Sequence, residues 1–272
     1  MVRFSRFGAV LLMILGGGVL FAQSASRGLS VVSIPTEQGE VELYNNSHAL
    51  IVANSDYTAG WPDLPGVVDD AEEVAAALSS HGFDVTVALD QTSAEIDATY
   101  RNFINLHGQD PQNRLLFFYA GHGYTQTLAT GLEMGYIVPV DSPNPNVDQT
   151  GFNITAMDMQ QIEVYAKRIQ SKHAMFLFDS CFSGSIFSLS RAIPENISYK
   201  TSEPVRQFIT AGNEDQEVPD DSVFADQFVR ALEGDADSND DGFLTGTELG
   251  EYLQSSVINY TRNAQTPQYG KI

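Results

Sequence analysis

The stretch His173-Ala-Met-Phe-Leu-Phe-Asp179-Ser-Cys181-Phe-Ser-Gly184 decides the fold of this chain, together with a matching stretch upstream, Arg114-Leu-Leu-Phe-Phe-Tyr-Ala-Gly-His122-Gly123. Each contains a continuous apolar run of about five residues, which is typical of a strand covered on both faces. Each run ends in a polar turn that carries one reactive side chain, Cys181 or His122. Because ligands bind at the carboxyl ends of strands in an open α/β sheet, we expect this thiol and imidazole to face each other on neighbouring strands. That is the geometry of a cysteine–histidine nucleophile pair.

The rest of the chain alternates between strand-like and helix-like patterns. Short apolar stretches predict strands at residues 49–53, 84–89, 114–119 and 206–211, and a shorter extended piece at 136–141. Helical spacing predicts helices at residues 67–81, 156–170, 224–232 and 247–259, and another from a Thr92–Glu95 capping box to about residue 107. This alternation predicts an α/β fold, a three-layer αβα sandwich with a mostly parallel central sheet.

Three segments of different character divide the chain. Residues 1–24 combine a basic start, a short apolar run with three glycines and a small-residue exit, which is typical of a secretory signal peptide. We therefore expect export to the periplasm or the outside of the cell; the alternative is an uncleaved N-terminal membrane anchor, for which the run is short. Residues 25–46 are polar without a clear period and predict a linker or arm, and residues 47–268 form the predicted domain. No other segment is apolar enough to cross a membrane, so we expect no membrane contact after signal removal.

The net charge of −21 makes nucleic acid an unsuitable partner and favours cationic peptides or bivalent cations. With one cysteine, the chain cannot form an internal disulfide. A lone thiol in an exported protein is a liability unless it is buried or used. The oligomeric state stays open, and a monomer is compatible with the sequence.

The residues around Cys181 and His122 supply the other groups that acyl transfer needs. A thiolate is the nucleophile, and a histidine lowers the thiol's pKa and later protonates the leaving amine. The amides of Gly123 and Cys181 are candidates for stabilising the oxyanion of a tetrahedral intermediate. The alternative is that Cys181 is a small buried hydrophobic residue and His122 an ordinary turn histidine. The matched strand-to-turn contexts favour the catalytic interpretation.

These stretches resemble those of the caspase-like cysteine peptidases, most closely the bacterial metacaspase (orthocaspase) branch. The resemblance rests on Tyr119-Ala-Gly-His122-Gly123 and Asp179-Ser-Cys181-Phe-Ser-Gly184, and it extends in the family's order over roughly residues 48–268. In caspases the catalytic histidine lies about 50 residues before the cysteine. The resemblance implies a caspase-like sandwich and a dyad of His122 and Cys181.

Metacaspases cut after arginine or lysine with acidic pocket residues, which by position map onto Asp70 and Asp179. Carboxylates suit this role because they bind a guanidinium through charge-assisted hydrogen bonds. The alternatives are that Asp70 is a solvated charge in the first turn of its helix and that Asp179 only holds a turn. The resemblance also places a processing site in the long loop after Cys181, with Arg191 and Lys200 as the candidates for self-cleavage.

A second motif, Asp237-Ser-Asn-Asp-Asp-Gly-Phe-Leu-Thr-Gly-Thr-Glu248, matches an EF-hand calcium loop between two predicted helices. Its expected ligands are Asp237, Asn239, Asp241, the Phe243 carbonyl, Thr245 and Glu248. The alternative is a hydrogen-bonded structural turn, since calcium hands usually come in pairs. A filled site would act as a structural or activating brace, and we expect no organic cofactor.

The sequence therefore predicts an exported cysteine endopeptidase that hydrolyses peptide bonds after basic residues of peptide and protein substrates. The alternative is a catalytically inactive caspase-like module that binds peptides or partners and is braced by calcium. The family often has histidine where this chain has Phe182 and serine where it has Ala120, and fold alone does not imply function.

Overall fold

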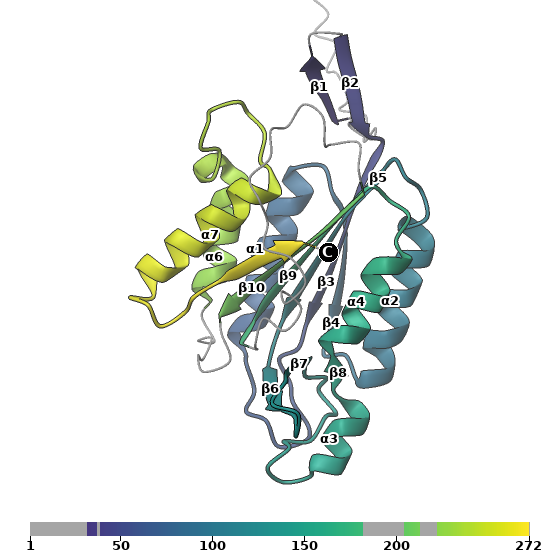
Figure 1. The fold of residues 1–272 in the computed structure, drawn as a ribbon, viewed down its shortest axis with the longest axis vertical. Coiled ribbons are helices and arrows are strands. Elements are labelled where there is room, and N and C mark those ends of the chain that lie inside the picture. Colours follow the sequence, from purple (N-terminus) through teal and green to yellow (C-terminus); the bar gives the residue numbers. More distant parts are fainter. Residues whose placement is uncertain (1–31, 37–38, 182–203, 213–221, 272) are drawn as a thin grey trace, which may run out of the picture.

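The computed structural model describes residues 32–36, 39–181, 204–212 and 222–271. Their central feature is a six-stranded sheet in the order β11-β10-β9-β5-β3-β4 (Figure 1). Five strands are parallel and β11 is antiparallel to β10. The strands are β3 (Asn46–Ala53), β4 (Asp84–Leu89), β5 (Asn113–Ala120), β9 (His173–Cys181), β10 (Val205–Gly212) and β11 (Gln268–Lys271). The predicted mostly parallel sheet is confirmed.

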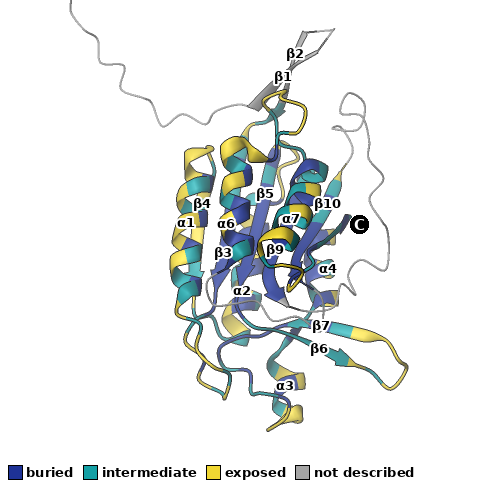
Figure 2. Ribbon diagram, turned by 90° about the vertical axis from the view of Figure 1, so that its left-hand side faces the viewer, coloured by how far each residue is buried: buried dark blue, intermediate teal, exposed yellow. Residues whose placement is uncertain are grey.

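Helices cover both faces of this sheet. One face carries α1 (Gly66–Ser80), α6 (Val223–Arg230), the π-helical turn η2 (Ala231–Asp235) and α7 (Gly246–Tyr260). The other face carries α2 (Ser93–His107) and α4 (Met159–Arg168). Figure 2 shows α1, α6 and α7 exposing their outer faces while the strands behind them are buried. This is the predicted αβα sandwich.

The continuous apolar runs form the middle of the sheet because both of their faces are covered. Residues Leu115 to Ala120 of β5 are all buried. The parallel register aligns Phe117 with Phe176 and Phe176 with Phe208. Their rings stack at centroid distances of 4.4 Å and 4.9 Å across three strands. A slip by one residue would turn these rings to the opposite face, so the aromatic ladder fixes how the ends of β5 and β9 align.

Local signals set most helix boundaries where the sequence predicts them. The Thr92–Glu95 capping box is formed at the start of α2. The prediction of one helix at 156–170 was wrong in detail, because two helices, α3 (Gln149–Thr155) and α4, flank the short strand β8 (Met157–Asp158). Ala156 is extended, and the Asp158 carboxylate accepts a hydrogen bond from the Gln161 amide and starts α4. The side-chain cap therefore starts the helix three residues later than periodicity alone predicts.

Two further elements lay outside the sequence prediction. A small sheet of β6 (Gly123–Thr127), β7 (Glu133–Ile137) and β8 follows the His122 turn, where only an extended piece at 136–141 was expected. In the stretch expected to be a linker or arm, β1 (Val32–Thr36) and β2 (Gly39–Tyr44) pair as an antiparallel hairpin. Among the described helices, none has the length and apolarity to cross a membrane. The predicted signal peptide lies outside the described residues.

Candidate active site

The carboxyl ends of β5 and β9 lie side by side, as the two matched stretches predict. Ala120 is the register partner of Asp179, and the Gly121 amide donates to the Asp179 carbonyl oxygen at 3.4 Å. His122 lies two residues after Ala120, and Cys181 lies two residues after Asp179. The Cys181 backbone also pairs with Gly212 of β10. The backbone thus brings both predicted catalytic residues to one edge of the sheet. The side chain of Cys181 is outside what the structure describes.

The imidazole of His122 is held by the loop that follows β3. Its Nε2 lies 2.8 Å from the Pro62 carbonyl oxygen. A carbonyl only accepts, so Nε2 carries the hydrogen and the neutral ring keeps its lone pair on Nδ1. The rings of Tyr57 and Trp61 lie 4.6 Å and 5.0 Å from the imidazole centroid. Burial lowers the pKa of His122, and the Pro62 carbonyl partly opposes that effect. The ring is therefore a neutral base with Nδ1 as its basic atom at neutral pH.

The amide of Gly123 is left unused by the sheet that begins there. Gly123 pairs with Ile137, and the Val138 amide donates to the His122 carbonyl oxygen at 3.0 Å. In an antiparallel ladder, this bond pattern makes Gly123 and Ile137 a non-hydrogen-bonded pair. The Gly123 N–H therefore points away from β7. That direction suits an oxyanion donor, and the role itself stays a prediction.

The two predicted pocket carboxylates, Asp70 on α1 and Asp179 on β9, influence each other. Asp179 is 4% exposed. Burial raises the pKa of Asp179 to about 7; the nearby Ser222 hydroxyl opposes the shift and the Asp70 charge adds to it. Neither Asp179 oxygen accepts a hydrogen bond of standard geometry from the described part of the chain. A buried carboxylate without such bonds is costly to ionise, which is why the carboxyl has a raised pKa. Asp70 is thus electrostatically coupled to Asp179, and its role as a pocket residue stays a prediction.

Comparison with known proteins agrees with this arrangement. The family model for the caspase domain matches residues 46–269. The chain belongs to the caspase domain family. A solved structure, protein GSU0716 from Geobacter sulfurreducens, is similar with a TM-score of 0.56 and 15% sequence identity, covering 83% of this chain and 93% of that one, which shows the shared fold. No protein with a curated description matched the chain.

Several groups of this caspase domain are at the site but were not predicted. Trp61 and Pro62 contact His122, and the Ser222 Oγ lies by Asp179 while it caps the start of α6. The side chains of Ser180 and Gln265 are buried without hydrogen-bond partners among the described residues. Gln265 lies three residues before Gln268, the β11 partner of Thr210 near the carboxyl end of β10. A lone serine or glutamine carries no sequence signal of this kind, because its place depends on strand order.

The calcium loop folds as a turn stabilised by its own side chains. The Asp237 carboxylate accepts from the amides of Asp241 and Gly242, and Gly242 has the positive φ of 80° that the sixth loop position requires. Glu248 accepts from Thr245 and from the Asn239 side chain at 3.0 Å. The donor set and turn fit a calcium loop. Among the described residues, however, no three His, Cys, Asp or Glu side chains are grouped to hold a metal ion.

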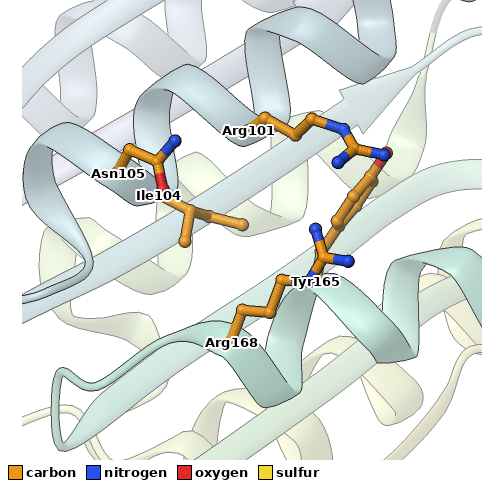
Figure 3. A pocket seen from close by; sticks show the side chains of 5 residues that line it. All are labelled: Arg101, Ile104, Asn105, Tyr165 and Arg168. Atoms are coloured by element: carbon orange, nitrogen blue, oxygen red, sulfur yellow. The ribbon is translucent and has the colours of Figure 1, made fainter.

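A separate pocket lies between α2 and α4 (Figure 3). It is lined by Arg101, Ile104, Asn105, Tyr165 and Arg168. None of these is a predicted site residue, and both helices lie on the face opposite α1, which carries Asp70. This pocket is thus distinct from the candidate active site.

Proposed function

We propose that this chain is an exported cysteine endopeptidase of the metacaspase type that cleaves peptide bonds after arginine or lysine. The observation that supports this best is the buried Asp179 carboxyl, two residues before Cys181 and electrostatically coupled to Asp70. An enzyme that cut after acidic residues would need cationic groups at this place. Here a basic side chain would complete the site.

In the proposed mechanism, Cys181 attacks the scissile carbonyl carbon and His122 handles the proton. Nδ1 of His122 accepts the thiol proton and later gives it to the leaving amine, while Nε2–H stays on the Pro62 carbonyl. The amides of Gly123 and Cys181 would donate to the oxyanion of the tetrahedral intermediate. Water then hydrolyses the acyl-enzyme, with His122 as the base.

The proposed specificity uses the charge of Asp179 and Asp70. A guanidinium or ammonium group of the substrate would favour the ionised form of Asp179 and lower its pKa from about 7. Charge-assisted hydrogen bonds gain strength away from water, so a buried carboxylate discriminates well between a basic and a neutral side chain.

Three further parts of the proposal rest on sequence alone or on local geometry. We propose that residues 237–248 bind calcium as a structural or activating brace; the loop's donor set and the positive φ of Gly242 support this. We also propose export, on the signal-peptide pattern of residues 1–24, and self-cleavage at Arg191 or Lys200; all of these residues lie outside the described part of the chain. An active-site variant that is processed like the wild type would rule self-cleavage out.

Fluorogenic peptides that differ only in the residue before the cleaved bond test the function. We expect hydrolysis after arginine or lysine, none after aspartate, and no activity in Cys181→Ala. Activity that survives Cys181→Ala would overturn the mechanism, and cleavage after aspartate would overturn the specificity. The rival, an inactive binding module, predicts that a thiol-reactive peptide probe ending in arginine fails to label the wild type.

A further inference from the structure

We propose that two buried tyrosines, Tyr57 and Tyr119, are positioning residues that hold His122 by its backbone so that its Nδ1 faces the nucleophile. This inference rests on the proposed function, because it concerns the geometry of the same dyad. The tyrosines come from different segments: Tyr57 follows β3, and Tyr119 lies in β5.

Tyr57 binds the backbone amide of His122. Its hydroxyl accepts a hydrogen bond from the His122 N–H at 2.8 Å, and Tyr57 is 6% exposed. Its own amide donates to the Asp63 carboxylate at 3.0 Å, one residue from Pro62, whose carbonyl accepts from the imidazole. The loop that holds the histidine ring thus also holds the phenol that binds the histidine backbone.

Tyr119 binds the other side of the same residue. Its hydroxyl lies 2.9 Å from the His122 carbonyl oxygen and 3.1 Å from that of Val138, and it is fully buried. A phenol has one proton, so it donates to one of these oxygens at a time. The Val138 amide also donates to the His122 carbonyl at 3.0 Å, which ties this carbonyl to the start of the β6–β7 sheet.

Gly121 lets both phenols reach this backbone. Its φ of 149° lies in the region that favours glycine, and a Cβ there would lie 2.7 Å from the Tyr57 hydroxyl and 2.9 Å from that of Tyr119. The small residue before His122 therefore leaves space for the two hydroxyl groups. Burial raises the pKa of both phenols, so both hydroxyl groups remain protonated over the working pH range.

His122 is consequently fixed at three points: its N–H, its C=O and its Nε2–H. Only Nδ1 remains for chemistry. Loss of the Tyr57 hydroxyl leaves the His122 N–H without its partner, and loss of the Tyr119 hydroxyl leaves the His122 carbonyl with the Val138 amide alone. In either case the His122 turn will relax. Because a shift of about 1 Å costs up to roughly 100-fold in rate, the effect belongs in kcat.

The experiment compares Tyr57→Phe and Tyr119→Phe with Tyr165→Phe as the matched control. The control also removes the hydroxyl of a tyrosine with a buried ring; this hydroxyl donates to Asp97 on α2. With an arginine peptide we expect kcat to fall about 10- to 100-fold in both test variants, with KM within about twofold and wild-type kcat in the control. Urea unfolding measures the stability lost in each variant.

A second readout needs no substrate. In ¹⁵N-labelled histidine spectra, assigned with His122→Gln, wild-type neutral His122 should be the Nε2–H tautomer, and the two test variants should show a mixture of tautomers. Wild-type kcat and an unchanged tautomer in both variants would overturn the inference, as would an equal kcat loss in Tyr165→Phe. If the wild type cleaves no arginine peptide, the proposed function fails, and the spectra still decide whether the tyrosines position His122.

Discussion

At the scale of single residues, the Asp179 carboxylate should lower the stability of the protein and provide the proposed specificity for basic side chains. Its carboxyl is almost fully buried, and burial raises its pKa to about 7. A carboxyl whose pKa is raised on folding stabilises the native state fully below its unfolded pKa, and that contribution is lost as the pH rises through the folded value. At pH 8 the native protein therefore contains a costly buried charge.

Asp179→Asn should separate these two effects. Removing the charge is expected to raise the free energy of unfolding at pH 8 by on the order of 1–4 kcal/mol, because the raised pKa sets the upper limit. It should also reduce kcat/KM for arginine peptides by at least about 100-fold. Urea unfolding and peptide hydrolysis at pH 8 measure both. A variant that is less stable than the wild type and still cleaves after arginine would contradict the role of Asp179.

Trp61 offers an optical test of the His122 environment. It is the one tryptophan of the chain, and its ring lies 5.0 Å from the imidazole of His122. A protonated imidazole quenches a neighbouring indole, and burial lowers the pKa of His122 below 6.5. Tryptophan fluorescence should thus fall on acidification with a midpoint below pH 6.5. The midpoint should be absent in His122→Gln; if it persists there, another group causes the quenching.

At the scale of elements, Arg206 joins the end of α4 to β9 and β10. It is 8% exposed, and its guanidinium donates to four main-chain carbonyl oxygens at 2.6–3.0 Å, those of Ala166, Ile169, Lys172 and Val205. These include carbonyls at the C-terminal end of α4, where cations are favourable. The planar guanidinium of arginine has five N–H donors and suits four carbonyls at once, whereas the ammonium group of lysine does not.

Arg206→Lys should therefore be strongly destabilising despite the retained charge. We expect a loss of about 2–4 kcal/mol in the free energy of unfolding, because several buried carbonyls lose their donors. Arg101→Lys is the control, since exposed Arg101 pairs with Asp97 within one helix and its replacement should change stability little. Equal effects in urea unfolding would show that the buried fork is not what stabilises this junction.

Calcium binding by residues 237–248, the predicted calcium loop that precedes most of α7, can be tested through thermal stability. Millimolar calcium, but not magnesium, should raise the melting temperature, because a ligand that binds only the native state stabilises it. Glu248→Gln should abolish the increase while it retains the capping box with Thr245, since glutamine also serves at that position. Glu163→Gln, a change in an exposed ion pair on α4, is the control. Absence of a shift in the wild type would leave the loop as a structural turn only.

At the scale of the whole molecule, the contributions of His48 and Asp179 to the stability of the native state change with pH in opposite directions. Burial and the stacked ring of His107 lower the pKa of His48, while Asp84 opposes this. A histidine with a lowered pKa stabilises the native state above its unfolded pKa of 6.5, and that contribution is lost as the pH falls. The effect of Asp179 has the opposite sign between about pH 4 and 7.

The two single variants should consequently tilt the pH profile of stability in opposite directions. Relative to the wild type between pH 7 and 5, Asp179→Asn should lose stability on acidification, and His48→Gln should gain it. Urea unfolding at several pH values measures the slopes, and the differences between variants cancel the shared contribution of the other carboxylates. Parallel profiles in all three proteins would contradict these pKa directions.

Local sequence patterns predicted a large part of the fold. The apolar runs before His122 and Cys181 predicted buried neighbouring strands, and the Thr92–Glu95 capping box predicted the start of α2. The same stretches predicted a caspase-like domain, and the family match over residues 46–269 confirms it. These features are encoded locally because strand burial, helical period and caps depend on residues close in sequence.

The sequence by itself determined which strands carry the predicted dyad and where the predicted pocket carboxylates lie along the chain. Only the tertiary structure decided that Pro62 binds the His122 ring, that Tyr57 and Tyr119 bind its backbone, and that Ser222 lies beside Asp179. Most of these contacts join segments that are distant along the chain. Such contacts follow from strand order and register, which a local pattern does not contain. Burial is likewise a property of the packed molecule, so the raised pKa of Asp179 emerges only when α1, α6 and β9 come together.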